Sequence, residues 1–82
     1  MGHAHDAKIR EKVRSEAASI GARMIFELRH HDIFEFPELK LMEGFAKWAK
    51  TVKHVKEVDV GMDIGIDGSE KPNLRIAVKY ER

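Results

Sequence analysis

Hydrophobic residues in the first third of the chain recur at steps of three and four, the period of an amphipathic helix. The positions are Ile9, Val13, Ala17, Ile20, Met24 and Leu28. Asp6 precedes them and can cap the first helical turn. We therefore predict a helix over residues 7–31, with residues 1–6 disordered. Gly21 costs about 1 kcal/mol relative to Ala inside a helix, so a kink there is the alternative.

A second helix is predicted over residues 37–55. Pro37 suits a first helical turn because it needs no N–H partner, and Glu38 places negative charge at the positive end of the helix dipole. The predicted core-facing arc holds Leu41, Phe45, Trp48, Val52 and Val55. The opposite arc is mostly basic and holds Lys40, Glu43, Lys47, Lys50 and His54.

Beyond the second helix the period of the hydrophobic pattern changes to two, which predicts strands. Residues 58–67 alternate apolar residues with Asp and Gly, and residues 74–81 alternate apolar with mostly charged residues. A turn over residues 68–73, which contains Pro72, separates them. Pairing Asp63 with Lys79 and Asp67 with Arg75 would place opposite charges across the outer face.

These elements predict one α+β domain over residues 1–82, in which two amphipathic helices pack on one face of a C-terminal antiparallel β-hairpin, in the order α-α-β-β. A two-stranded sheet is marginal in water and leaves both edges open. We therefore expect dimerisation to extend the sheet. A chain of 82 residues buries little surface, which also favours a homo-oligomer, with a dimer preferred.

Composition narrows the function classes. With no cysteine, the chain has no disulfide framework, thiolate chemistry or Cys-ligated zinc, and a reducing, cytoplasmic location is compatible. Neither a signal peptide nor a membrane-spanning segment is expected. The net charge is +1, but residues 40–56 carry five lysines against one glutamate, whereas residues 57–70 carry five carboxylates and no basic residue.

The leading hypothesis is a non-enzymatic protein-binding or assembly module that self-associates, its protein partner being otherwise unidentified. Small residues at Ala18 and Ala22 permit close approach of another element to the first helix. Glycines inside a predicted strand often mark close approach of another backbone. The predicted partner-binding residues are Ala18, Ala22, Phe26, Gly61, Asp63, Gly65 and Arg75.

The alternative is a nucleic-acid-binding protein that uses the basic face of the second helix. Several cations on one face can follow a phosphate backbone. The residues for this role are Lys40, Lys47, Lys50 and Lys53. The whole chain is not basic and no base-stacking aromatic accompanies them, so a solvated helix face is the simpler explanation.

No catalytic residue, metal ligand or cofactor is predicted, because the sequence has no nucleophile-base pair, phosphate-binding loop or H-E-x-x-H motif. A minor hypothesis is a site at a dimer interface where His30, His31 and His54 converge. Met1, Gly2 and His3 would form an amino-terminal copper or nickel chelate if Met1 were retained, but Gly2 favours its removal, and His3 and His5 resemble a remnant of cloning.

Overall fold

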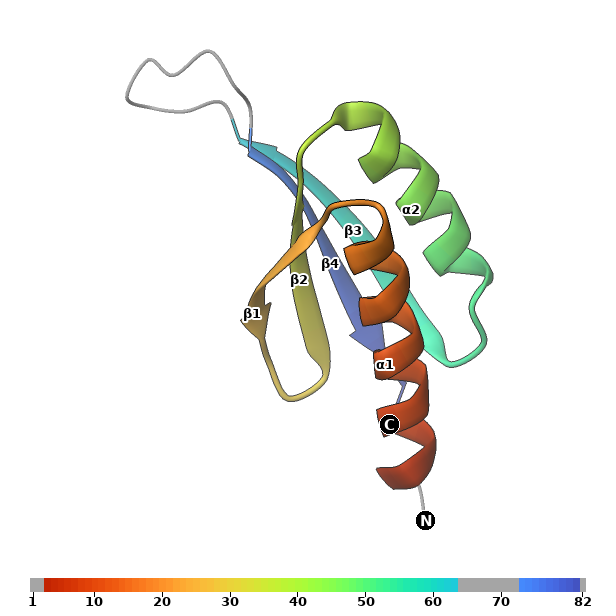
Figure 1. Cartoon of the computed structure of the whole chain (residues 1–82). Coiled ribbons are helices and arrows are strands. Elements are labelled where there is room, and N and C mark those ends of the chain that lie inside the picture. The colour runs from red at the N-terminus through yellow and green to blue at the C-terminus, as the bar shows by residue number, and fades with distance from the viewer. Residues whose placement is uncertain (1–2, 64–72, 82) are drawn as a thin grey trace.

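The computed structural model describes residues 3–63 and 73–81 of the chain. Its two helices lie on one face of an antiparallel sheet of four strands in the order β1-β2-β4-β3, and leave the other face uncovered (Figure 1). In chain order the elements are α1 (His3–Ser19), β1 (Arg23–Glu27), β2 (His31–Phe36), α2 (Leu39–Thr51), β3 (Val55–Asp63) and β4 (Asn73–Tyr80).

The predicted order α-α-β-β is wrong, because two strands lie between the helices. The second half of the helix predicted over residues 7–31 and the connector after it form β1 and β2. One chain therefore supplies four strands. The expectation that dimerisation extends a two-stranded sheet loses its basis. Residues 1–6 were expected to be disordered; from His3 onward the structure describes them as the start of α1.

Helix α1 ends at Ser19 because Gly21 follows it in the left-handed region, with φ 85°. The Ala22 N–H donates to the Ala17 carbonyl at 2.9 Å and the Gly21 N–H to the Ala18 carbonyl at 3.1 Å. This pair of hydrogen bonds is the Schellman motif, which terminates helices where a glycine adopts positive φ. Gly21 is thus the helix stop, and the predicted kink inside a longer helix is wrong.

Strand β2 alternates strictly between the two faces of the sheet. Its buried residues, Asp32, Phe34 and Phe36, point toward the helices. The preceding strand β1 is an edge strand, and a bulge between Met24 and Phe26 interrupts its pairing with β2. The spacing of Met24 and Leu28 resembled a helical stripe, but neither side chain joins the core, since they are 39% and 48% exposed.

Helix α2 is shorter at both ends than the predicted residues 37–55. Glu38 is the extended N-cap residue and Val52 the extended C-cap residue. The prediction of its two arcs is largely confirmed, because Phe45 is buried and Trp48 and Val52 pack against the core. Lys40, Lys47, Lys50 and Lys53 are exposed.

The predicted hairpin of β3 and β4 is present, but with a different register. Lys79 lies opposite Glu57 rather than Asp63, and Arg75 lies opposite Gly61. The shift is an even number of residues, so each side chain keeps its predicted face. Asp67 and the predicted turn before Asn73 lie outside the described residues.

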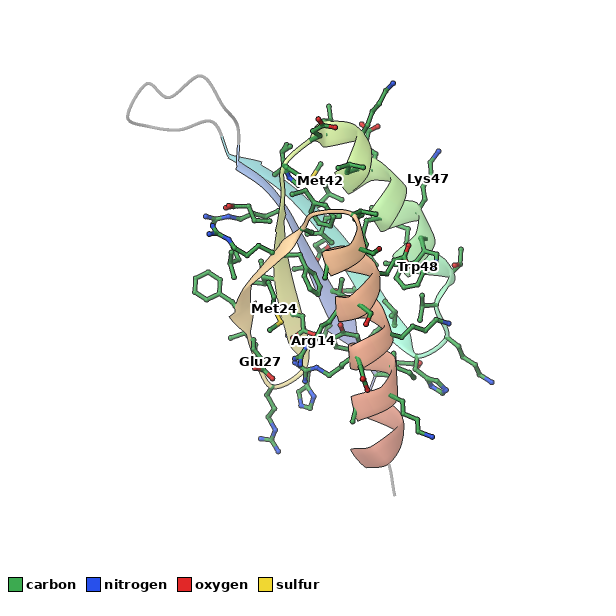
Figure 2. The ribbon with its side chains drawn as sticks, in the orientation of Figure 1. Arg14, Met24, Glu27, Met42, Lys47 and Trp48 are labelled. Carbon is green, nitrogen blue, oxygen red and sulfur yellow. The ribbon has the colours of Figure 1, made fainter. Side chains whose placement is uncertain are left out.

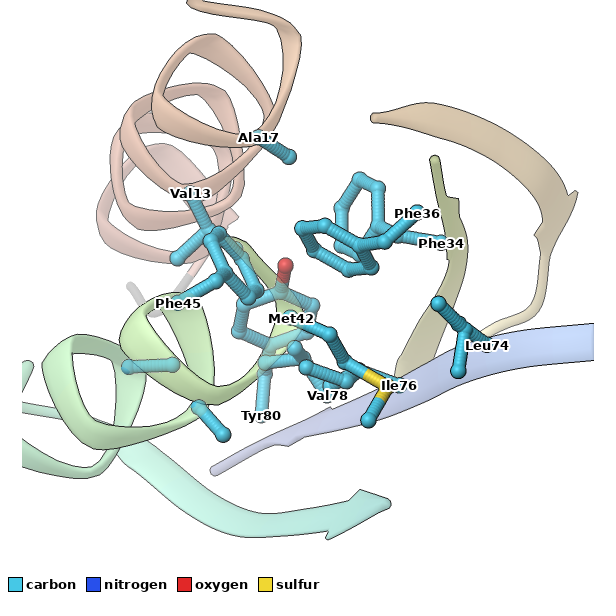
Figure 3. Close-up of a cluster of buried hydrophobic side chains, with 12 residues drawn as sticks. Val13, Ala17, Phe34, Phe36, Met42, Phe45, Leu74, Ile76, Val78 and Tyr80 are labelled. Carbon is cyan, nitrogen blue, oxygen red and sulfur yellow. The ribbon is translucent and has the colours of Figure 1, made fainter. Parts of the chain in front are cut away.

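The core lies between the sheet and both helices (Figure 3). The Phe45 ring on α2 contacts three aromatic rings, with centroid separations of 5.6 Å to Phe34, 5.1 Å to Phe36 and 5.7 Å to Trp48. The remaining buried hydrophobic residues are Val13, Ala17, Met42, Ala46, Ala49, Leu74, Ile76, Val78 and Tyr80.

Candidate functional site

The face of the sheet that no helix covers carries side chains in three rows that run across the strands. The strand registers define each row, because residues opposite one another share a face. The first row is Arg23, Glu35, Arg75 and Gly61; the second is Phe26, Ile33, Ala77 and Asp59; the third is His31, Lys79 and Glu57.

The second row is apolar over three strands. The Phe26 side chain is 54% exposed, and Ile33 and Ala77 are half-buried. A depression of about 250 Å³ lies over this row, lined by Phe26, Ile33, Asp59, Val60, Gly61, Arg75 and Ala77. Its floor is low because Ala77 and Gly61 have little or no side chain. A Cβ atom built on Gly61 meets nothing within 4 Å, so packing inside the monomer does not require glycine there.

The charges of this open face alternate in sign. Glu35 pairs with Arg23 at 3.0 Å and with the Arg75 Nε atom at 3.6 Å. The Arg75 Nε atom is buried and has no hydrogen-bond partner among the described residues. The three rows contain three cations (Arg23, Arg75 and Lys79) and three carboxylates (Glu35, Glu57 and Asp59). Within these three rows the cations and carboxylates are therefore equal in number.

Some of the predicted partner-binding residues come together and others do not. Phe26, Gly61 and Arg75 line the same depression. Ala18 is exposed on α1, on the helical side of the sheet, and Ala22 packs partly against the core. Asp63 is the last residue of β3, and Gly65 lies outside the described residues.

Of the lysines predicted to bind nucleic acid, three lie on α2, on the helical side of the sheet, and Lys53 follows that helix. Lys47 extends from α2 away from the sheet (Figure 2). Lys40, Lys50 and Lys53 are also exposed, and none of the four forms an ion pair within the described residues.

The sequence analysis missed a buried ionic cluster centred on Asp32, whose side chain is fully buried. Arg10 donates to its carboxylate at 2.7 Å, Arg14 at 2.8 Å and the Tyr80 hydroxyl at 2.9 Å. Arg14 also reaches Glu27 at 3.0 Å, beside which it lies in Figure 2. The one signal in the sequence was Asp32 itself, an acidic residue in phase with Phe34 and Phe36, the apolar residues of the same alternating pattern.

Opposing effects set the pKa of Asp32. Burial alone would raise it, but the hydrogen bonds from Arg14, Arg10 and Tyr80 outweigh burial and hold the pKa below its ordinary value. The hydrogen bond to Asp32 in turn raises the pKa of Arg14. Burial raises the pKa of Tyr80, and the neighbouring carboxylate raises it further. The carboxylate is thus ionised and the phenol protonated near neutral pH.

The Asp32 cluster holds the fold together and offers no site for chemistry. Both carboxylate oxygens already accept hydrogen bonds from several donors, and neither is accessible to a ligand. Arg10 also donates to the carbonyls of Leu28 and Arg29 in the β1–β2 turn, at 2.8 and 2.9 Å. The cluster therefore fixes α1 to the turn and to β4.

Within one chain, the three histidines do not all lie together; their convergence across a dimer interface stays a prediction. His30 and His31 line a pocket at the end of the sheet, whereas the His54 Nδ1 atom lies 3.5 Å from Glu81. Within the described residues, no three His, Asp or Glu side chains are grouped as metal ligands. Neither described helix is long and apolar enough to cross a membrane.

Comparisons with known proteins add no functional information. No protein-family model, curated protein or solved structure matches the chain. The function must therefore be argued from the geometry of the described residues.

Proposed function

We propose that this protein is a non-enzymatic assembly module that self-associates through the open face of its sheet. The observation that carries the proposal is the apolar row formed by Phe26, Ile33 and Ala77, which no part of the described chain covers. Antiparallel sheets often leave one face in water, but the side chains on such a face are usually polar. An exposed apolar row with a charged border is typical of a protein-protein interface.

The charge pattern favours a second copy of the chain as the partner. In a two-fold dimer the same face occurs on both sides, so a face with a single sign of charge would repel itself. Here the three cations and three carboxylates permit opposite charges to meet.

The strand edges are less suited to association than the open face. A bulge between Met24 and Phe26 interrupts the edge strand β1, and a bulge between Val55 and Glu57 interrupts the edge strand β3. Bulges at edges oppose pairing with another chain. We therefore propose contact between faces, with two sheets packed about 10 Å apart.

Sedimentation equilibrium from low to high micromolar concentration tests the proposal. The wild-type mass should rise from 9.4 kDa toward twice that value. Phe26→Asp should weaken association by at least about 30-fold, because it places a charge in the centre of the apolar row.

The matched control is Leu39→Asp. Leu39 is also an exposed apolar residue, at 44%, but it lies at the start of α2, where an acidic residue suits the helix dipole. This variant should associate as the wild type does. A monomeric wild-type chain at high concentration, or equal effects of the two substitutions, would count against the open face as the interface.

We propose nucleic-acid binding as the second candidate, supported by the exposed Lys40, Lys47, Lys50 and Lys53, which have no ion-pair partner among the described residues. Fluorescence anisotropy with labelled DNA and RNA should then show binding that weakens steeply between about 50 and 200 mM salt. Lys47→Glu with Lys50→Glu should abolish binding while leaving the circular dichroism spectrum unchanged. Binding that survives this double charge reversal would exclude the α2 face.

A further inference from the structure

A second pocket, separate from the apolar depression, lies where β2, β4 and β3 meet at one end of the sheet. Its volume is about 480 Å³, and it is lined by His30, His31, Lys56, Lys79 and Tyr80. His31 and Lys79 are direct cross-strand partners. Lys56 is the extra residue of the β3 bulge, between Val55, which pairs with Tyr80, and Glu57, which pairs with Lys79. The bulge thus brings a second lysine to the pocket.

Among the described residues, the pocket lining contains cationic and donor groups but no carboxylate. Each ammonium group offers three donors and no acceptor, and each imidazole can donate at least one N–H. Lys56 and Lys79 form no ion pair with any described residue. Glu57 lies opposite Lys79 in the register but is not part of the lining.

Charge behind the pocket also favours an anion. The Arg10 guanidinium carbon lies 5.1 Å from the centre of the Tyr80 ring. The Tyr80 hydroxyl donates to the Asp32 carboxylate, whose negative charge is compensated by the ion pairs with Arg10 and Arg14. The groups that line the pocket therefore present donors and positive charge.

We propose that this pocket binds a small phosphate monoester. A phosphoryl group carries up to two negative charges and several acceptor oxygens, which match the two ammonium groups of Lys56 and Lys79. The pocket is within the size range of small-molecule sites, so it accommodates an organic group beside the phosphate. This proposal does not depend on self-association through the open face.

The test is a titration followed by ¹H–¹⁵N NMR, with three separate additions: inorganic phosphate, methyl phosphate, and sodium chloride at matched ionic strength. Saturable shifts of the backbone amides of His31, Lys56 and Lys79 are expected with phosphate or its ester and not with chloride. Tighter binding of methyl phosphate than of inorganic phosphate would identify an ester as the ligand; the reverse order would identify the free anion and overturn the ester assignment.

Lys56→Met and Lys79→Met should each weaken binding by about tenfold, through loss of one charge-assisted hydrogen bond. The matched control is Lys40→Met with Lys50→Met, which removes two exposed lysines of α2 and should leave the affinity unchanged. The same titration of Phe26→Asp should show unchanged binding, since Phe26 is not in this pocket. Equal shifts with chloride, or equal losses in the pocket and control variants, would overturn the proposal.

Discussion

Asp32→Asn is expected to lower the free energy of unfolding by about 3–5 kcal/mol, because it removes the charge that compensates two partly buried guanidinium groups. Arg10 and Arg14 both form ion pairs with this fully buried carboxylate. A domain of this length has a total stability of about 4–12 kcal/mol, so the substitution should remove at least about a quarter of it. Urea denaturation followed by circular dichroism measures the difference.

Glu27→Gln is the control for this prediction. Glu27 also accepts from Arg14, but its side chain is 61% exposed, so its ion pair should contribute less than about 1 kcal/mol. Similar losses of stability in the Asp32 and Glu27 variants would mean that the buried cluster does not hold α1 in place.

The effect of Asp32→Asn should also depend on pH. The pKa of Asp32 is lower in the folded protein than its ordinary value, which is about 3.9 in an unfolded chain. As the pH falls, the unfolded state therefore takes up a proton on Asp32 before the folded state does. The stability that Asp32 contributes is complete above its unfolded pKa and is lost as the pH falls through its folded pKa. The difference between wild type and variant should shrink as the pH falls below about 4; a constant difference would contradict this role.

The second large effect is expected for Phe45→Ala, which should destabilise the fold by about 3–5 kcal/mol. Phe45 is 2% exposed and contacts the rings of Phe34, Phe36 and Trp48, so its removal leaves a cavity between α2 and the sheet. Thermal or urea unfolding at low micromolar concentration measures this loss without a contribution from self-association.

Phe26→Ala is the matched comparison, because it truncates a phenylalanine on the open face of the same sheet. Its side chain is 54% exposed, so the stability of the monomer should change by less than about 0.5 kcal/mol, while self-association weakens. A loss of monomer stability as large as that of Phe45→Ala would show that Phe26 belongs to the core.

The open face of the sheet and the pocket at its end could be predicted only in part. The sequence indicated that Gly61 and Arg75 lie on the outer side of a strand, because period-two alternation assigns faces. It did not indicate that Phe26 joins them, since Phe26 was placed on a helix. The pocket formed by His31, Lys56 and Lys79 was missed, because it depends on the order of the strands and on the bulge in β3.

By itself, the sequence determined α2 and the two C-terminal strands, because their hydrophobic periods continue over many residues and local geometry decides which side faces the core. It did not determine how β1 and β2 form. Within residues 23–36, the spacing of Met24 and Leu28 is compatible with a helix, whereas the alternation over His31–Phe36 is compatible with a strand. The choice between them depends on Gly21, which ends α1, and on the pairing of β2 with β4. The tertiary structure also decided the register of β3 and the pairing of Asp32 with Arg10 and Arg14, because both depend on contacts between residues far apart in the chain.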